Sequence, residues 1–358
     1  MSHKLPLALL HELPPKPGNP RNSEGAFLRG RHGELLFAYS RYRADSNHDH
    51  APCDIALIVS EDEGEHWSEP RPIARAQDFG TQNIMSVSAM PCLNGDLAFY
   101  FLIKENDFTT TLGRTVSHDG IHFTAERCDC RFPSAYYVVN NDRLVRLSDG
   151  RIVAPASYIT AEQNRNSIRC PMIATFLISS DDGKTFRKTE WEGTTSDPVN
   201  ERYGLQETGI YQRIDGEIYI WARTGYGCQY EWSSPDALVS FTAPRASGFT
   251  APPSPMQIKA VNGTVYAIYN PIPNYNGRET PLGCWGRTPL VIRKSDDDGR
   301  TFGPLCVIED DPTRGYCYPA IFPTADGDLL LAYCRGNAQD GNTLCRLGIA
   351  KIKRSDIL

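Results

Sequence analysis

The octapeptide Ser295-Asp296-Asp297-Asp298-Gly299-Arg300-Thr301-Phe302 shows most clearly a short turn that the chain repeats. Four other stretches keep its frame of an opening Ser, a central Asp and a closing aromatic residue, and they span residues 60–67, 117–123, 179–186 and 234–241. The five copies lie at near-regular intervals along the sequence. Self-similarity at such a period predicts an array in which one supersecondary unit is repeated, either stacked or around a ring.

The residue types of this repeat are those of a rigid hairpin tip. An Asp side chain accepts hydrogen bonds from backbone N–H groups a few residues later, Gly supplies a positive φ, and the final aromatic residue folds back as a plug. The copy at 117–123 is one residue short, and the copy at 234–241 lacks the Gly, but both keep the frame. The pattern is the Asp-box, and five copies that each follow a strand-like run are far stronger evidence than one.

Each repeat also opens with a Gly turn that is followed by an apolar run. Asn-Gly or Asp-Gly between apolar runs is a strong signal for a β-hairpin, and these runs are rich in β-branched and aromatic residues. No long stretch shows the 3.6-residue period of an amphipathic helix. Six such segments are present, at Gly33–Tyr39, Gly95–Phe101, Asp149–Ala154, Asp215–Trp221, Asn262–Tyr269 and Asp326–Tyr333.

These units predict an all-β, six-bladed propeller that forms a single domain over residues 1–358. The expected blades span approximately residues 20–70, 80–125, 134–190, 203–245, 253–305 and 314–356. The sixth unit has a third strand, Leu344–Ile352, but no Asp-box after it. We expect an early strand at residues 4–13 to join this last blade and close the ring, which would remove an exposed sheet edge.

The composition argues against several classes of partner. The net charge of −6 disfavours a nucleic-acid partner, which needs a basic face. No stretch approaches the length of a membrane span, and residues 1–13 do not read as a secretory signal, so we expect a cytoplasmic protein without a membrane partner. A secreted chain whose signal has been removed would look the same. Eleven cysteines without metal-like spacing predict buried free thiols and no metal.

The chain resembles the sialidase (neuraminidase) superfamily of Asp-box propellers. It is similar in particular to bacterial sialidase-like proteins whose first blade opens with Asn-Pro-Arg-Asn-Ser-Glu-Gly, which here is Asn19–Gly25. The resemblance covers essentially the whole chain. It implies a retaining exo-glycoside hydrolase that releases a terminal acidic sugar, such as sialic acid, from an oligosaccharide or glycoconjugate. It implies no metal or organic cofactor.

Three arginines that hold the substrate carboxylate are implied by the resemblance. A planar guanidinium forms paired, charge-assisted bonds to a carboxylate, which is why Arg is expected. Arg21 has the location of the first, although its context is Arg-Asn-Ser where the family has Arg-Ile-Pro. Arg223, at the end of an apolar strand, matches the second, and Arg287 before a late strand matches the third. The alternative is that each is an ordinary surface or salt-bridging residue.

The resemblance also implies a Tyr nucleophile beside a Glu. Tyr is a poor nucleophile at its ordinary pKa of about 10, and a neighbouring carboxylate can accept its proton. Tyr318 matches this position, with Glu207 as its partner. The family usually has Ser after the Tyr, whereas Pro319 follows here, so Tyr316 stays a competing candidate and a possible substrate contact.

The acid/base of the family is an Asp on the loop after the opening strand of the first blade. Asp49 is our choice on the segment 45–54, with Asp45 and Asp54 as alternatives. General acid catalysis would require that the pKa of this carboxyl be held high. His48 and His50 flank Asp49. They give only a weak metal signal, so we expect His50 to be a polar wall residue that contacts substrate.

Two further clusters look too polar for ordinary strand starts. They open the second and third blades, where inner-strand starts ring the mouth of a propeller, and we expect Asn83, Asn141 and Arg143 to face substrate. The alternative for Arg143 is an ion pair with Asp142 between blades.

Two other functions remain open at this point. A propeller with Tyr, His and Arg at its mouth could act as a polysaccharide lyase, or as a hydrolase for another uronic or deoxy sugar. It could also bind carbohydrate without cleaving it, because a fold does not by itself determine a function.

Overall fold

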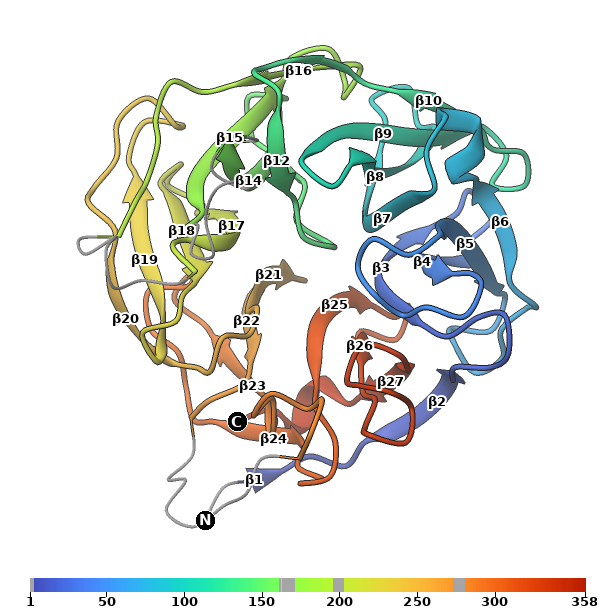
Figure 1. Cartoon of the computed structure of the whole chain (residues 1–358). Coiled ribbons are helices and arrows are strands. Elements are labelled where there is room, and N and C mark those ends of the chain that lie inside the picture. The colour runs from blue at the N-terminus through green and yellow to red at the C-terminus, as the bar shows by residue number, and fades with distance from the viewer. Residues whose placement is uncertain (1–2, 161, 163–170, 196–202, 273–280) are drawn as a thin grey trace.

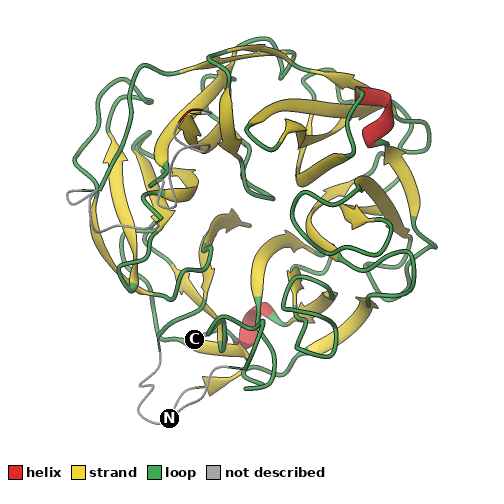
Figure 2. Cartoon of the chain, in the orientation of Figure 1, coloured by secondary structure: helices red, strands yellow, loops and turns green. Residues whose placement is uncertain are grey.

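The computed structural model describes residues 3–160, 162, 171–195, 203–272 and 281–358. This part of the chain is built from strands, with two short 3-10 helices, η1 (Ala76–Phe79) and η2 (Arg354–Asp356). The strands are arranged around a central axis as the blades of a propeller (Figure 1), and they dominate the whole ring (Figure 2). The predicted all-β propeller arrangement is confirmed. Within the described ranges, no helix is long and apolar enough to cross a bilayer.

Six successive groups of strands run around the ring, and in the described residues they form five sheets because the first two groups share one. The first group contains β3 (Asn22–Arg29), β4 (Leu35–Tyr42), β5 (Cys53–Ser60) and β6 (Arg71–Ala74). The second contains β7 (Asn83–Pro91), β8 (Leu97–Asn106), β9 (Thr109–Ser117) and β10 (Thr124–Arg127). One parallel pair, Cys53 with Asn83, joins these two groups into a single sheet. The third contains β11 (Asp129–Arg131), β12 (Ala135–Val138), β13 (Val145–Arg146), β14 (Ile152–Thr160), β15 (Ile173–Ser179) and β16 (Thr185–Lys188).

The remaining three groups are separate sheets. The fourth contains β17 (Gln206–Gln212), β18 (Ile218–Arg223), β19 (Cys228–Ser234) and β20 (Arg245–Thr250). The fifth contains β21 (Gln257–Val261), β22 (Thr264–Tyr269), β23 (Leu290–Ser295) and β24 (Cys306–Glu309). The sixth contains β25 (Cys317–Pro323), β26 (Leu329–Cys334) and β27 (Leu347–Ile352). The last strand begins later than predicted because a turn, closed by the bond from Cys345 N to Asn342 O, precedes it.

The N-terminal segment closes the ring, as predicted, but it also contacts a second group. Strand β2 (Ala8–Leu13) pairs antiparallel with β27 and supplies the outer strand of the sixth group. Strand β1 (His3–Lys4) pairs in parallel with β24 of the fifth group, which the sequence did not indicate. Leu5 lies between the two strands and is only 2% exposed. The segment therefore fastens two neighbouring groups together.

The hydrophobic core lies between neighbouring groups and continues all the way around the ring. A buried apolar cluster that includes Leu36 and Phe99 joins the first and second groups, and one that includes Ile268 and Leu331 joins the fifth and sixth. Corresponding clusters occupy the other four interfaces. Because each group packs on two neighbours, burial of apolar surface holds the ring closed.

All five predicted Asp-box turns form, and each connects the last two strands of its group. In every copy the Ser hydroxyl donates a hydrogen bond to the Asp two residues later, over 2.7–3.2 Å. The same hydroxyl accepts a backbone N–H, which comes from Gly64, Gly120, Gly183, Leu238 and Gly299 in the five copies. The box is thus a closed local network.

The fourth box forms without the glycine that the others use. Leu238 takes its place and adopts the left-handed conformation, with φ of 73°. A non-glycine residue in that region costs on the order of 1 kcal/mol or more. The Leu238 side chain is 7% exposed and packs in the cluster between the third and fourth groups, so its burial offsets this strain.

Four inner strands share one irregularity near their first residues. The pairing register shifts within β3, β7, β17 and β25, as it does at a β-bulge. At each shift one residue that is not glycine has a left-handed φ, and these residues are Glu24 (54°), Ser86 (63°), Glu207 (51°) and Tyr318 (55°). A bulge redirects the side chain at its position, so these four strands aim one side chain differently from a regular strand.

The Asp-box network provides a stability test with a matched neighbour. Asp297 accepts hydrogen bonds from Ser295 Oγ at 2.7 Å and from Thr301 N at 2.8 Å, whereas the adjacent Asp296 is exposed and makes neither bond. We expect Asp297→Ala to lower the midpoint of urea unfolding, and Asp296→Ala to leave it nearly unchanged. Hydrogen bonds from Thr301 hold the pKa of Asp297 below its ordinary value, so this contribution is present at neutral pH and decreases in acid. Equal midpoints for the two variants would contradict the role of the box.

Candidate active site

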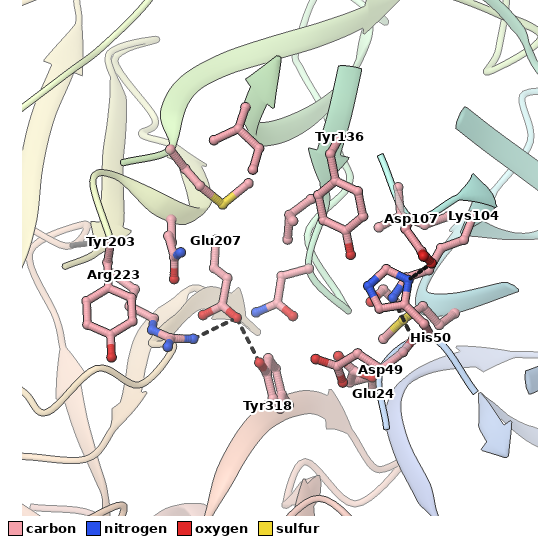
Figure 3. A pocket seen from close by; sticks show the side chains of 18 of the residues that line it. Glu24, Asp49, His50, Lys104, Asp107, Tyr136, Tyr203, Glu207, Arg223 and Tyr318 are labelled. Atoms are coloured by element: carbon pink, nitrogen blue, oxygen red, sulfur yellow. Dashed lines mark hydrogen bonds and ion pairs between the residues drawn. The ribbon is translucent and has the colours of Figure 1, made fainter. Parts of the chain in front are cut away.

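A pocket of about 860 Å³ lies where the inner strands meet. Its walls combine residues from five of the six groups, which are far apart in the sequence (Figure 3). Polar lining residues include Glu24, Asp49, His50, Lys104, Asp107, Tyr136, Tyr203, Glu207, Arg223 and Tyr318. Met85, Leu102, Ile159 and Met172 form apolar parts of the wall.

The bulges of the inner strands explain why the walls are polar. Glu24, Ser86, Glu207 and Tyr318 are the four left-handed residues described above, and all four line the pocket. In each strand the next residues return to regular pairing and pack against the second strand. The same type of β-bulge therefore turns one polar side chain in each of the four strands towards the central axis.

Tyr318 and Glu207 form a hydrogen-bonded pair on one wall. The Tyr318 hydroxyl donates to Glu207 Oε1 at 2.8 Å, and Arg223 Nη1 donates to the same oxygen at 3.1 Å (Figure 3). The side chains of Arg223 and Glu207 are 12% and 8% exposed, so the ion pair is largely shielded from solvent. The phenol, the carboxylate and the guanidinium are thereby held in one fixed arrangement.

The protonation states of this pair follow from their surroundings. Burial by itself would raise the pKa of Glu207, but the charges of Arg223 and Arg287 and the Tyr318 hydrogen bond outweigh it, and the pKa is lowered. Burial and the negative charge of Glu207 raise the pKa of Tyr318 well above its ordinary value. At neutral pH the pair is a neutral phenol beside a carboxylate that can accept its proton.

Arg287 supports this wall from behind. It is 5% exposed and does not line the pocket, and its Cζ lies 5.8 Å from the centre of the Tyr318 ring. Nη1 donates to Cys317 Sγ at 3.1 Å and Nη2 donates to the carbonyl of Pro253 at 3.2 Å. Two of the three predicted carboxylate-binding arginines, Arg223 and Arg287, therefore lie near the Tyr318–Glu207 pair.

Arg21 lies behind the opposite wall, where two carboxylates already bind it. Nη1 donates to Asp49 Oδ1 at 2.5 Å, and Nη2 donates to Glu24 Oε2 at 3.1 Å. Nε donates to Ser23 Oγ at 3.0 Å, and the guanidinium lies over the ring of Tyr42 with Cζ 4.3 Å from its centre. Arg21 is 1% exposed and does not line the pocket, so it does not converge with the other two arginines on one open site.

Asp49 lies on the loop that was predicted to carry the acid/base, and it faces the pocket. Asn83 holds this loop, because its Nδ2 donates to the carbonyls of Asp49 and Ala51 at 3.1 and 2.6 Å. Lys104 Nζ donates to the carbonyl of Asp49 at 2.6 Å. Burial by the pocket walls would raise the pKa of Asp49, but Arg21 and Lys104 outweigh it and lower the pKa strongly. The carboxyl is therefore ionised at neutral pH in the absence of a ligand.

Other predicted contacts have structural positions instead. Arg143 is buried, donates to Gln257 Oε1 at 2.8 Å and lies over the ring of Trp221, so it ties the third group to the fourth and fifth. It does not pair with Asp142, whose Oδ1 instead accepts from Lys259 Nζ at 2.8 Å. Burial lowers the pKa of Arg143 to about 10. The polar strand start reflects contacts between groups.

Asn141 and Tyr316 also lie outside the pocket lining. Asn141 Nδ2 donates to the carbonyl of Tyr318 at 3.2 Å and to that of Gly25 at 3.0 Å, so it fixes the backbone at the bulge. Tyr316 is fully buried, with its ring centre 6.2 Å from that of Tyr333. Of the two candidate tyrosines, only Tyr318 is placed to reach a ligand in the pocket.

His50 lines the pocket, as expected, beside residues that the sequence reasoning did not select. Its Nδ1 lies 3.2 Å from Asp107 Oδ1. Among the described residues, no three His, Cys, Asp or Glu side chains come together in a way that could hold a metal ion.

The lining residues that were not predicted from the sequence include Glu24, Lys104, Asp107, Tyr136 and Tyr203. A signal existed for Glu24, which belongs to the quoted stretch Asn19–Gly25, and for Lys104, which interrupts an apolar run.

The buried ion pair of Glu207 makes a second stability prediction. Glu207→Gln leaves Arg223 and Arg287 without their shared anion, and we expect a loss of about 3 kcal/mol in unfolding free energy at pH 7. Because the folded pKa of Glu207 is lowered, its contribution is present above the unfolded pKa and decreases as pH falls through the folded pKa. Urea unfolding across pH checks both points, with the exposed Glu61→Gln as control. A stability equal to that of the control would show that the anion does not stabilise the wall.

Comparisons with known proteins agree with this architecture. The structure is similar to a protein of unknown function from Dyadobacter fermentans, with a TM-score of 0.72 and 16% identity over 97% of this chain and 99% of that one. A Hadza microbial sialidase gives a TM-score of 0.73 with 14% identity, covering 95% of this chain and 67% of that one. The NanB sialidase from Streptococcus pneumoniae gives 0.69 with 13% identity, covering 99% and 71%. At such low identity these likenesses establish the fold alone.

The sequence comparison places the chain in a family. None of the curated proteins matches it. The model of the BNR repeat-like domain matches residues 33–331, which is most of the chain and includes all five Asp-boxes. The protein therefore belongs to the BNR repeat-like domain family, and it has the fold of the sialidases.

Proposed function

We propose that the protein is a sialidase-type retaining exo-glycoside hydrolase that releases a terminal acidic sugar from an oligosaccharide or glycoconjugate. In this proposal the six strand groups are the six blades of a single-domain sialidase-type propeller. The observation that carries it is the Tyr318 hydroxyl, which donates to Glu207 at 2.8 Å inside the pocket. A phenol with a neighbouring carboxylate base is an activated nucleophile.

In the first step the Tyr318 oxygen attacks the anomeric carbon. The phenol proton moves to Glu207 as the bond forms, so no free phenolate is required despite the raised pKa of Tyr318. Arg223 shares the accepting oxygen and stabilises the carboxylate before the proton arrives. The bond to the leaving oxygen breaks on the side of the sugar away from Tyr318. Asp49 and Glu24 lie across the pocket from Glu207 and Arg223 (Figure 3).

The acid/base of the reaction comes from that opposite wall. Asp49 lies there beside Glu24, and Arg21 binds both carboxyl groups. A retaining mechanism requires a group that protonates the leaving oxygen and later removes a proton from water. Tyr318 on one wall supplies the nucleophile, and the carboxyl groups of Asp49 and Glu24 on the other wall supply this acid/base.

The charges around the pocket favour an acidic sugar. Arg223 lines the pocket and Arg287 lies behind Tyr318, so both attract a substrate carboxylate near the nucleophile. Arg21 is occupied by Asp49 and Glu24, and a substrate carboxylate would have to displace one of them. This occupancy keeps a uronic acid as a second candidate beside sialic acid, because it leaves Arg223 as the one predicted arginine that lines the pocket.

Substitution of the two tyrosines tests the nucleophile. We expect Tyr318→Phe to reduce turnover by at least about 1,000-fold while substrate affinity changes little, because only the attacking oxygen is lost. Tyr316→Phe removes a buried hydroxyl outside the pocket and should retain activity. Activity is measured with the substrate that the screen below identifies, and affinity by calorimetry on inactive protein. Full activity of Tyr318→Phe would exclude Tyr318 as the nucleophile.

A screen of acidic oligosaccharides tests the reaction itself. Sialylated and uronic-acid oligosaccharides are incubated with the protein, and released sugars are identified by mass spectrometry. We expect a free terminal acidic sugar. An unsaturated product that absorbs in the ultraviolet would indicate a lyase, and binding without any cleavage would indicate a carbohydrate-binding propeller.

A further inference from the structure

Two carboxyl groups of the pocket share a single guanidinium. Arg21 binds Glu24 through Nη2 and Asp49 through Nη1, and both carboxyl groups lie on the same wall (Figure 3). Two nearby carboxylates repel each other. Arg21 hydrogen-bonds to both carboxyl groups, whereas Lys104 Nζ, which lies beside them, donates to the backbone carbonyl of Asp49 and to neither carboxyl group. One proton on the pair would remove the repulsion between the two carboxyl groups.

The two carboxyl groups differ in how well they can carry a negative charge. The Glu24 side chain is 5% exposed, whereas that of Asp49 is 58% exposed because it opens into the pocket. Arg21 donates to Asp49 over the shorter distance, 2.5 Å against 3.1 Å for Glu24. A carboxylate is costly to bury unless its charge is compensated, so the buried member of the pair favours the neutral form.

We propose that Glu24 holds the proton of this pair in the free protein and donates it to the leaving glycosidic oxygen, while Asp49 stays ionised. This assignment rests on the proposed glycoside hydrolysis. It gives the acid role to Glu24 in place of Asp49, which the position on the loop indicated. Glu24 Oε2 is occupied by Arg21 and by the Ser23 hydroxyl at 3.1 Å. Among the described residues, none donates to Oε1, which leaves this oxygen for the proton and the substrate.

The electrostatic surroundings of the two carboxyl groups support the same assignment, with Glu24 protonated and Asp49 ionised. Burial raises the pKa of Glu24, and the charge of Asp49 raises it further, against the opposing effect of Arg21. Arg21 and Lys104 lower the pKa of Asp49 despite its partial burial. The titratable or charged groups that act on Glu24 from all sides are Arg21, Asp49, Lys104, Tyr42, Cys53, Tyr136, Tyr318 and Cys334. Two carboxyl groups whose pKa values are pushed apart are the usual arrangement for acid/base work.

The backbone at Glu24 explains how a buried carboxyl can reach the substrate. Its left-handed φ of 54° turns the side chain towards the pocket, and Gly25 follows. A Cβ atom at Gly25 would lie 2.3 Å from Phe37 Cζ, so only glycine lets the strand pack this closely behind Glu24. The bulge and the close packing of Gly25 therefore direct the Glu24 side chain towards the pocket.

The protons balance over both steps of the reaction. In the first, Tyr318 bonds to the anomeric carbon and gives its proton to Glu207, while Glu24 gives its proton to the leaving oxygen and the sugar departs as a neutral alcohol. In the second, water attacks the anomeric carbon and gives one proton to the Glu24 carboxylate. The bond to Tyr318 breaks, and its oxygen takes back the proton held by Glu207. No other reactant is required.

A titration without substrate tests where the proton resides. Protein labelled with 13C at the side-chain carboxyl of either Glu or Asp is examined by infrared spectroscopy as pH is raised. We expect a protonated carboxyl band that persists above the ordinary Glu range and shifts only with the Glu label. Among the described Glu side chains whose pKa is shifted, that of Glu24 is raised, whereas those of Glu63, Glu105, Glu192 and Glu207 are lowered.

Variants assign the band to a residue. Glu24→Gln should abolish it, and Asp49→Asn should keep it but move its loss to lower pH, because the neighbouring negative charge is gone. Glu61→Gln, an exposed control, should leave it unchanged. A band that follows the Asp label, or no such band in the wild-type protein, would overturn the proposal even if Glu24→Gln does not fold.

The kinetic arm uses two substrates with the same sugar. Glu24→Gln should lower kcat/KM by about 100-fold or more for a natural glycan, whose leaving group needs a proton. It should lower kcat/KM much less for an activated aryl glycoside. Equal losses on the two substrates would overturn the donor role. If the infrared band is as expected but neither substrate is cleaved by the wild-type protein, the proposed hydrolysis fails and the location of the proton still stands.

Discussion

The pocket depends on a backbone constraint, the left-handed residue near the start of four inner strands. A regular strand would alternate its side chains between the two faces of its sheet. The bulges interrupt this alternation and turn Glu24, Ser86, Glu207 and Tyr318 to the axis. None of the four is glycine, so each carries conformational strain that the packing behind it must offset. Asn141 contributes by holding the carbonyls of Tyr318 and Gly25 together.

The walls of the pocket divide into two ionic clusters with opposite tasks. Around Tyr318, two arginines face one carboxylate, which keeps Glu207 ionised and ready to accept a proton. Around Arg21 the proportion is reversed, because two carboxyl groups face one arginine. In the proposed reaction the same residue types provide a base on one side of the pocket and a proton donor on the other.

Much of this arrangement could be predicted from the sequence, because its signals are local. The Asp-boxes, the Gly turns and the pairing of the early strand with the last group all follow from short patterns. Tyr318 and Glu207 are 111 residues apart, and the structure brings them to 2.8 Å. The contacts of Arg21 and Arg143 could not be predicted, because a long side chain can reach several neighbours and only the packed ring decides between them. The pairing of His3 with Cys306 is too short to leave a pattern.

The closure of the ring has a consequence for how the chain folds during synthesis. The N-terminal segment leaves the ribosome early, but its partners β24 and β27 are made near the end of the described chain. Until then Leu5 and the strand after it have no place to bury their apolar side chains. The last core interface can therefore form only after β27 has been made, and the nascent chain must shield an unpaired strand until then.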